Sequence, residues 1–432
     1  MAEQVVEKKK GLMHRATDAV SLFFERLGQR WHYARLMRRI RAYPKGRKIR
    51  VGFWVDNTSK WKAQSLYEVL AKLEDFEPVI LLSACCSDVK NWGARIGEKL
   101  AKDEAFYEGL GDRCERAFDV EEMRARPLRE FHADIVFYQE PIGFFMEQVV
   151  WETMKDSICC YLPYSVKMLG EHREYQNLSW FHQLMYVYIA LNEKDAAFER
   201  EGRVWWRRAG RVVGLGHTIF DQYEKDGRDD WTLEKVKEGF IIYAPHFSFP
   251  CDEPRLITLS SFLENGRQIL AYAMAHPEQK WVFKPHPRLR FELVNKGVWT
   301  KEEVDAYYGA WEKIGAGYYS GDYIGLFRQA RAMVTDCGSF CAEFPVTGKP
   351  LIRLIPQAYD FPVRPAFQAM MESFYVVHNL DEMYATFAQV LERGEDPKKG
   401  SRLQAMRELG VLPSHAAERI AEFLARECGR GA

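Results

Sequence analysis

Several sequence motifs of metal and nucleotide chemistry are missing from this chain of 432 residues. It has no Asp-x-Asp pair, the usual carboxylate motif for a metal-held nucleotide sugar. It also has no G-x-G-x-x-G dinucleotide fingerprint and no Walker A loop. The nine cysteines form no C-x-x-C pair, which argues against a zinc ribbon and a thioredoxin-type motif. We therefore expect neither a bound metal ion nor a cofactor.

Long apolar segments are absent as well. No stretch reaches the roughly 18 apolar residues of a membrane-spanning helix, and the charged N-terminus lacks the apolar segment of a signal peptide. The number of cysteines is odd, and Cys85-Cys86 and Cys159-Cys160 adjoin apolar segments, which is typical of buried thiols. These features predict a reducing, cytoplasmic compartment.

Positive charge is concentrated near the N-terminus, although the formal net charge of the chain is zero. Residues 1–50 hold 14 Lys and Arg against 4 Asp and Glu, a balance of +10, so the other 382 residues carry −10. This distribution argues against nucleic-acid binding by the body of the protein.

Residues 1–48 are predicted to form a basic amphipathic helix or arm. Apolar side chains recur at helical spacing on one face, namely Val20, Phe23, Phe24, Leu27, Trp31 and Ala34. Six arginines lie around and beyond that face: Arg26, Arg30, Arg35, Arg38, Arg39 and Arg41. Aromatic residues beside arginines are typical of a helix on an anionic membrane surface, which would make the protein peripheral at the inner face of the cell membrane. Packing on its own domain and docking to a partner protein are the alternatives.

Short apolar segments alternate with helical patterns along the rest of the chain, which predicts α/β domains with doubly wound parallel sheets. The first series of predicted strands covers 49–55, 78–83, 135–138, 158–162, 186–191 and 212–215. The second series covers 240–244, 281–284, 317–319, 333–335, 351–354 and 374–377. Residues 221–238 are charged and poor in aliphatic side chains, as in an exposed linker. We therefore expect Rossmann-like domains over 49–220 and 239–432.

Polar clusters follow two strands of the second series. Their candidate ligand-binding residues are Lys284, His286, Arg288, Asp336, Gly338 and Ser339. Ligands of open α/β sheets bind outside the carboxyl ends of the strands, so we expect both clusters to face one crevice. A helix that begins at Gly338 and Ser339 would offer backbone N–H groups to a phosphate. The alternatives are an N-cap role for Asp336 and Ser339 and a structural or solvated His286.

The order of these motifs resembles the CDP-glycerol glycerophosphotransferase family, which contains teichoic-acid and capsule polymer synthases. The matching segments are 214–221 (GLGHTIFD), 241–246 (IIYAPH), 284–289 (KPHPRL) and 335–343 (TDCGSFCAE). The resemblance covers roughly residues 155–360 and is strongest from 240 to 355. It implies the GT-B architecture, in which an acceptor domain (49–220) and a nucleotide-donor domain (239–432) face a cleft.

The resemblance also implies a reaction. A glycerol-phosphate or related polyol-phosphate unit would pass from a CDP-linked donor to a polysaccharide, a teichoic-acid-like polymer or a lipid-linked acceptor, with release of CMP and without a metal ion. His286 matches the histidine of the family's H-P motif at the donor phosphates, and Ser339 matches a serine at its helix start. His246 and Glu343 are further donor-binding candidates.

One segment departs from the family pattern. The family's W-H-G-T-P-L-K segment carries a candidate general base, whereas the corresponding stretch here, 161–169, has no histidine. Glu171, His172 and His246 are the candidates to replace it, and Glu171 and His172 join His286 as predicted catalytic residues. A general base needs a pKa near the operating pH, and it must lie within hydrogen-bond distance of the proton that it removes.

Two other classes of function stay open at this stage. One is a GT-B glycosyltransferase with a nucleotide-sugar donor, for which Glu343 is the obvious sugar-recognising carboxylate. The other is a non-catalytic relic that binds a glycan. A relic is expected to lose Lys284, His286 and Ser339 together, and this chain keeps all three.

Overall fold

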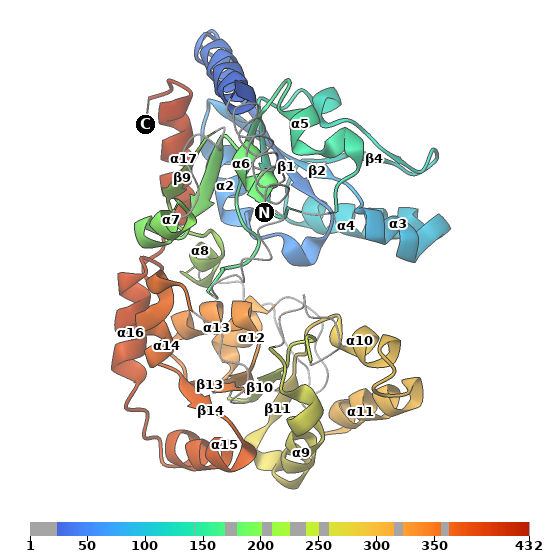
Figure 1. Ribbon diagram of the computed structural model, residues 1–432, viewed down its shortest axis with the longest axis vertical. Coiled ribbons are helices and arrows are strands. Elements are labelled where there is room, and N and C mark those ends of the chain that lie inside the picture. The colour runs from blue at the N-terminus through green and yellow to red at the C-terminus, as the bar shows by residue number, and fades with distance from the viewer. Residues whose placement is uncertain are drawn as a thin grey trace, which may run out of the picture. The chain divides into compact units, whose positions relative to one another are not determined.

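The computed structural model describes residues 24–141, 143–168, 179–200, 210–224, 239–249, 259–314, 323–355 and 363–431. The chain divides into two compact α/β units, each described here by itself (Figure 1). The first unit comprises Met1–Ser165, Tyr175–Ile219 and His415–Ala432. The second unit comprises Val166–Glu174 and Phe220–Ser414.

The first unit is built on a seven-stranded sheet of order β3-β2-β1-β6-β7-β8-β9, in which every pairing is parallel. Its strands are β1 (Ile49–Val55), β2 (Phe76–Leu82), β3 (Cys114–Arg116), β6 (Ile135–Tyr138), β7 (Ile158–Tyr161), β8 (Val187–Ala190) and β9 (Arg211–Gly214). The central strands are buried on both faces, as their continuous apolar sequences predict. A short antiparallel pair, β4 (Phe118–Asp119) and β5 (Arg124–Ala125), lies outside this sheet.

The helices of the first unit cover this sheet. They are α2 (Gln64–Lys72), α3 (Cys86–Trp92), α4 (Ile96–Gly109), α5 (Val150–Thr153), α6 (Ser179–Leu184), α7 (Glu193–Arg200) and α17 (Ala416–Glu427). Helix α17 packs against α2, although more than 300 residues separate them in sequence. The last residues of the chain therefore belong to the first unit and not to the second domain predicted over 239–432.

The second unit holds a five-stranded parallel sheet of order β11-β10-β12-β13-β14. Its strands are β10 (Ile241–Ala244), β11 (Trp281–Phe283), β12 (Ala332–Thr335), β13 (Leu351–Leu354) and β14 (Tyr375–Val377). Its helices are α8 (Ile219–Glu224), α9 (Phe262–Ala275), α10 (Leu289–Asn295), α11 (Lys301–Lys313), α12 (Ile324–Gln329), α13 (Gly338–Glu343), α14 (Gln368–Glu372), α15 (Leu380–Phe387) and α16 (Lys399–Glu408). The strand predicted at 317–319 lies outside the described residues.

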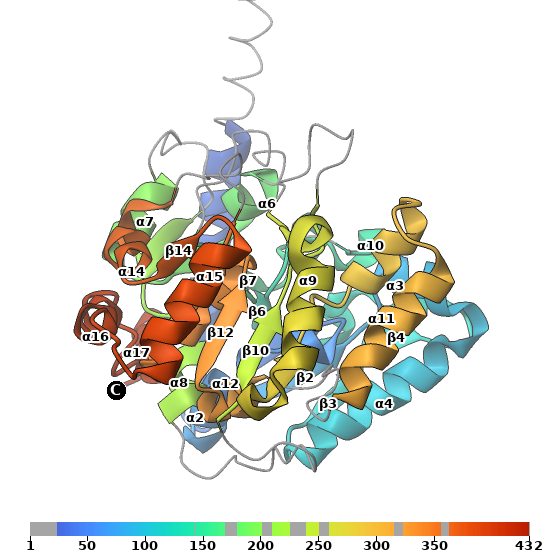
Figure 2. The same cartoon turned by 90° about the horizontal axis from the view of Figure 1, so that it is seen from below.

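Aromatic side chains fill the core on one face of the second sheet. Helices α9, α11 and α15 lie over that face (Figure 2). Phe283 of β11 stacks on Trp311 of α11 with ring centroids 5.0 Å apart, and Tyr272 of α9 stacks on Tyr384 of α15 at 4.4 Å. The first contact anchors β11, whose carboxyl end carries the predicted residues Lys284 and His286, and the second joins two of the covering helices.

The N-terminal helix, residues 24–41 of the described chain, packs on the first unit. Its buried face consists of Tyr33, Leu36, Met37 and Ile40, all part of the hydrophobic core. The Tyr33 hydroxyl also donates a hydrogen bond to the carbonyl of Leu184 at 2.9 Å. Packing of this helix on its own domain, one of the alternatives left open by the sequence, is therefore observed.

The apolar face predicted from the sequence is a different one. Val20 and Phe23 lie outside the described residues. Phe24, Leu27 and Trp31 are 63%, 49% and 64% exposed. The helix is thus apolar on two sides, and the side carrying Tyr33 and Leu36 is the one buried in the core of the first unit. Among the described helices, none is both long and apolar enough to cross a membrane.

Candidate functional site

Three segments meet at the carboxyl ends of β10, β11 and β12, here called the second-unit edge. They are the loops that begin at Pro245, Lys284 and Asp336. Strands β10 and β12 are neighbours, yet the chain runs from β10 outward to β11 and returns to begin the other half of the sheet at β12. Such a switch in strand order opens a crevice in which α/β proteins bind their ligands.

Asp336 organises the second-unit edge through its buried carboxylate. One oxygen accepts from the backbone N–H of His246 at 2.5 Å, and the other accepts from the backbone N–H of Ser261 at 2.7 Å. Burial raises the pKa of Asp336 to about 7, against the effect of these hydrogen bonds. Asp336 therefore ties the loop after β10 to the start of α9 and does not cap α13, since the N-cap position belongs to Cys337.

Two histidines lie side by side at this edge. The ring centroids of His246 and His286 are 4.9 Å apart, and Phe247 lies 4.4 Å from His286. The guanidinium of Arg288 lies over the Phe247 ring, 4.4 Å from its centroid, and forms an ion pair with Glu292. The structure thus brings three of the predicted donor-binding residues into one cluster.

Burial and nearby cations lower the pKa of both imidazoles. Burial, Arg288 and Lys284 lower the pKa of His286 to about 4. Burial, followed by the charges of His286 and Arg288, lowers the pKa of His246 well below its usual value. Both rings are therefore neutral at pH 7 in the free protein, and each can donate one hydrogen bond and accept another.

The remaining predicted residues of this edge differ in exposure. Lys284 is buried and continues the sheet, since its N–H donates to the carbonyl of Tyr243 at 2.8 Å. Gly338 and Ser339 are half-buried at the start of α13, a helix of six residues. Glu343 is buried at the far end of α13 and accepts a hydrogen bond from the Tyr323 hydroxyl at 2.7 Å. The predicted catalytic residues Glu171 and His172 lie outside the described residues.

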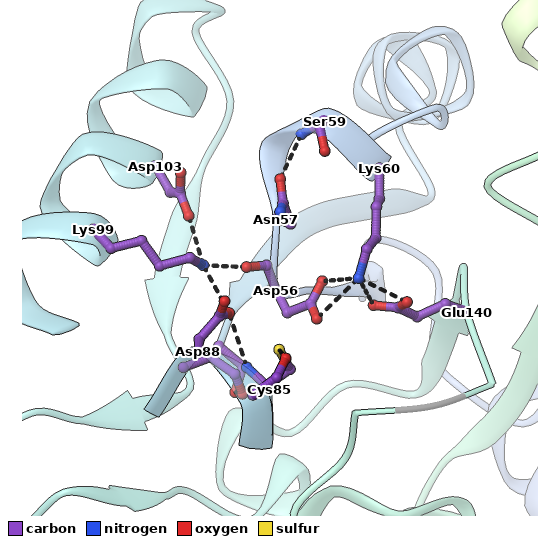
Figure 3. Close-up of polar contacts among 12 residues, drawn as sticks. Asp56, Asn57, Ser59, Lys60, Cys85, Asp88, Lys99, Asp103 and Glu140 are labelled. Carbon is purple, nitrogen blue, oxygen red and sulfur yellow. Dashed lines mark hydrogen bonds and ion pairs between the residues drawn. The ribbon is translucent and has the colours of Figure 1, made fainter. Parts of the chain in front are cut away.

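A second polar cluster, which contains none of the predicted site residues, lies at the carboxyl ends of β1, β2 and β6, here called the first-unit edge (Figure 3). Asp56 follows β1, and Glu140 follows β6, the next strand in the sheet. The strand order again reverses between these two strands, because β2 and β3 lie beyond β1 and β7 to β9 lie beyond β6. The cluster therefore occupies the switch point of the first sheet.

Lys60 connects the two carboxylates of this switch point. Its Nζ lies 2.6 Å from Glu140 Oε1 and 3.3 Å from Asp56 Oδ2. The side chains of Asp56 and Glu140 are only 3% and 5% exposed, whereas that of Lys60 is 30% exposed. Figure 3 shows the Lys60 amine between the two carboxylates.

The fold shifts the proton affinity of this group. Burial and the neighbouring Asp56 carboxylate raise the pKa of Glu140 to about 8, against the opposing effect of Lys60. Burial alone would lower the pKa of Lys60, but its ion pairs with Asp56 and Glu140 raise it above the ordinary value. A carboxyl group with a pKa near neutrality can exchange a proton in either direction at physiological pH, as catalytic acids and bases do.

The neighbouring part of the first-unit edge centres on Lys99. Its Nζ lies 2.9 Å from Asp103 and 3.2 Å from Asp88, and it also donates to the backbone carbonyl of Asp56. The ligand atoms of Asp56, Cys85 and Asp88 lie within 4.8 Å of one another. They fit a metal ion poorly, because Lys60 and Lys99 already neutralise the carboxylates and burial raises the pKa of the Cys85 thiol to about 11.

The segment expected to carry the family's general base also reaches the first-unit edge. It follows β7, and the backbone N–H of Tyr164 donates to the carbonyl of Gln139 at 2.9 Å, next to Glu140. A carboxylate thus lies close to the segment in which the matching histidine is missing. The signal in the sequence was that Asp56 directly follows one predicted strand and Glu140 lies two positions after another, but only the strand order shows that those strands are neighbours.

Comparison with known proteins adds the fold type. No protein-family model matches this chain, and no curated protein matches it in sequence. Similar solved structures include a UDP-GlcNAc 2-epimerase from Neisseria meningitidis bound to UDP-GlcNAc, with 13% identity, a TM-score of 0.55 and coverage of 88% of this chain and 100% of that chain. The Methanocaldococcus jannaschii UDP-GlcNAc 2-epimerase in complex with UDP-GlcNAc and UDP shares 15% identity with this chain at a TM-score of 0.54. The match covers 88% of this chain and 99% of that chain.

A third similar structure is the wall teichoic acid polymerase TagF with CDPG. It shares 11% identity with this chain at a TM-score of 0.51, over 95% of this chain and 98% of that chain. The chain has the GT-B fold. This confirms the predicted fold class of two Rossmann-like parallel-sheet units. At these identities the likeness is one of fold, so the chemistry of this GT-B chain has to be argued from its own residues.

Proposed function

We propose that this GT-B chain transfers a glycerol-phosphate or related polyol-phosphate unit from a CDP-linked donor to a polysaccharide, teichoic-acid-like or lipid-linked acceptor at the cell surface. The observation that carries the proposal is the convergence of the 241–246, 284–289 and 335–343 segments at the second-unit edge. These segments carry the resemblance to the glycerophosphotransferases, and they meet at a sheet position suited to ligand binding.

In this proposal the second-unit edge binds the donor diphosphate. Arg288 and Lys284 supply positive charge, while the neutral His286 imidazole and the Ser339 hydroxyl supply hydrogen-bond donors. Negative charge that develops on the departing CMP is stabilised by donors already held in place. Asp336 is a positioning residue, because its oxygens fix the loop that carries His246.

Glu140 is the proposed general base for the acceptor hydroxyl. The hydroxyl oxygen attacks the β-phosphorus and forms the new P–O bond. The bond from that phosphorus to the bridging oxygen breaks, and CMP leaves with the electron pair. The hydroxyl proton passes to the Glu140 carboxylate, whose raised pKa favours its uptake. No metal ion is required in this scheme.

The ligands of the fold neighbours support a nucleotide-linked donor. The Neisseria meningitidis epimerase binds UDP-GlcNAc, and TagF was soaked with CDPG. A nucleotide-sugar donor is therefore the second candidate, and the Glu140 carboxyl, whose pKa is raised to about 8, fits an enzyme that acts on a sugar as well.

The experiment that tests the proposal is a donor-turnover assay on the full chain. CDP-glycerol, CDP-ribitol and UDP-GlcNAc are each incubated with the protein in EDTA and a teichoic-acid-like acceptor, and released nucleotide is quantified. We expect acceptor-dependent release of CMP from a CDP-linked donor. Acceptor-dependent release of UDP in place of CMP would establish the second candidate, and isomerisation of UDP-GlcNAc without transfer would contradict both.

A further inference from the structure

The exposed face of the N-terminal helix is apolar over two turns. Phe24, Leu27 and Trp31 recur at i, i+3 and i+7 on the side opposite the buried face. Because the buried face packs into the core of the first unit, the exposed face is held in a fixed orientation on that unit. Large apolar side chains that follow one helical stripe differ from single exposed hydrophobic residues, which need no explanation.

Positive charge continues this stripe. Arg35 and Arg38 follow Trp31 at i+4 and i+7 and are both exposed. Residues 24–48 contain nine Lys and Arg and a single acidic residue, Glu25. The rest of the chain beyond residue 50 carries a net −10, so the excess of positive charge lies in the N-terminal part of the sequence.

We propose that the exposed face formed by Phe24, Leu27, Trp31, Arg35 and Arg38 docks on an anionic lipid surface. Helices that lie in the plane of a membrane have aromatic and leucine side chains toward the acyl boundary and arginines beside the headgroups. Each basic residue close to an anionic surface strengthens binding by about fivefold. The helix lies on the surface and does not span it, since none of the described helices meets the requirement for a span.

This inference goes beyond the proposed reaction and does not depend on it. It concerns where the protein acts, and the face involved shares no residue with either edge of the two sheets. Its test therefore measures lipid binding and not turnover.

The test is co-sedimentation of the full chain with vesicles of phosphatidylcholine alone or mixed with phosphatidylglycerol. We expect binding to the mixed vesicles, weakened by added salt, and little binding to the neutral ones. The variant Phe24→Ser/Leu27→Ser/Trp31→Ser is expected to lose at least tenfold in affinity. Arg35→Glu/Arg38→Glu is expected to lose the preference for anionic lipid.

A matched control is Phe106→Ser, which removes a side chain that is 44% exposed on α4 of the same unit. It is expected to bind vesicles like the wild type. Because all substituted side chains are exposed, we expect the melting temperatures of the variants to stay close to that of the wild type. Absence of wild-type binding, or equal binding by the triple variant, would overturn the proposal. Light scattering that shows a wild-type dimer lost in the triple variant, without vesicle binding, would assign the face to a second copy.

Discussion

Glu140 and His286 are side chains whose proton affinities the fold shifts in opposite directions. Burial and Asp56 raise the pKa of Glu140 to about 8, whereas burial, Arg288 and Lys284 lower that of His286 to about 4. Around neutral pH, Glu140 can therefore take up or release a proton, while His286 stays neutral. These two states are the ones that the proposed general base and the proposed phosphate ligand require.

Replacing Glu140 tests its role as the base. Glu140→Gln keeps the shape and removes the proton acceptor, so we expect turnover to fall by about 10²–10⁴-fold. Wild-type turnover should rise with pH through about 8 as Glu140 ionises, and the variant should lack this rise. Asp103→Asn, at another buried carboxylate paired with a lysine, is the matched control and should retain the wild-type pH profile. A Glu140→Gln enzyme with full activity would exclude Glu140 as the base.

Replacing His286 changes the acid stability of the protein. Its pKa in the folded protein, about 4, lies below the 6.5 of an unperturbed histidine, so the unfolded chain binds more protons between these values. The contribution of the neutral, buried His286 to the free energy of unfolding is complete above pH 6.5 and is lost as the pH falls toward 4. Urea unfolding at several pH values should therefore show less acid destabilisation in His286→Gln than in the wild type. His276→Gln, at a histidine whose side chain is 43% exposed, should behave like the wild type; identical curves for His286→Gln would contradict the assignment.

The residues of the second-unit edge were predictable from the sequence to a greater extent than those of the first. His246, His286 and Asp336 each follow a short apolar segment in a recognisable motif. Asp56 and Glu140 carry no such motif, and 84 positions separate them. They approach each other because β1 pairs with β6, and strand order depends on long-range packing that a local pattern does not contain.

At the scale of elements, Asp336 holds together parts that are distant in sequence. Its oxygens accept from the loop after β10 and from the start of α9. Asp336→Ala leaves these buried donors without an acceptor, which costs about 1–3 kcal/mol for each. Asp336→Asn retains one oxygen and should lose less. Urea unfolding measures the stability of both variants. An Asp336→Ala variant as stable as the wild type would show that the hydrogen bonds of Asp336 do not stabilise the fold.

The N-terminal helix offers a matched pair of leucines on its two faces. Leu36 is buried in the core, whereas Leu27 is 49% exposed. Leu36→Ala should lower the free energy of unfolding by about 2–5 kcal/mol, and Leu27→Ala should change it by less than about 0.5 kcal/mol. Equal effects in chemical denaturation would mean that the helix does not pack as described.

Removal of residues 1–45 deletes the whole buried face, so we expect the truncated chain not to fold.

Most elements of the fold followed from the apolar pattern, but the orientation of this helix did not. Strands β1, β6, β7, β10, β12 and β13 lie where short apolar segments predicted them. The N-terminal helix has one apolar stripe through Phe24 and Trp31 and another through Tyr33 and Ile40. Helical spacing identifies both stripes, and only the surface available on the first unit decides which one is buried.

At the scale of the whole molecule, the alternation of strands and helices predicted two α/β units, and the structure has two. The return of α17 to the first unit was not predictable, because its sequence shows an amphipathic helix but not the surface that it covers. Each unit has a polar cluster at the switch point of its sheet. The sequence resemblance had emphasised only the second of these clusters.

The central claim is that the second-unit edge binds a CDP-linked donor without a metal ion. Isothermal titration of CDP-glycerol into the wild type and His286→Ala, both in EDTA, tests it most directly. We expect the wild type to bind CDP-glycerol more tightly than UDP-GlcNAc. His286→Ala should lose about 0.5–1.5 kcal/mol of binding free energy, the typical contribution of one neutral hydrogen bond, while remaining folded. No binding in EDTA, tighter binding of UDP-GlcNAc, or unchanged affinity in His286→Ala would contradict the claim.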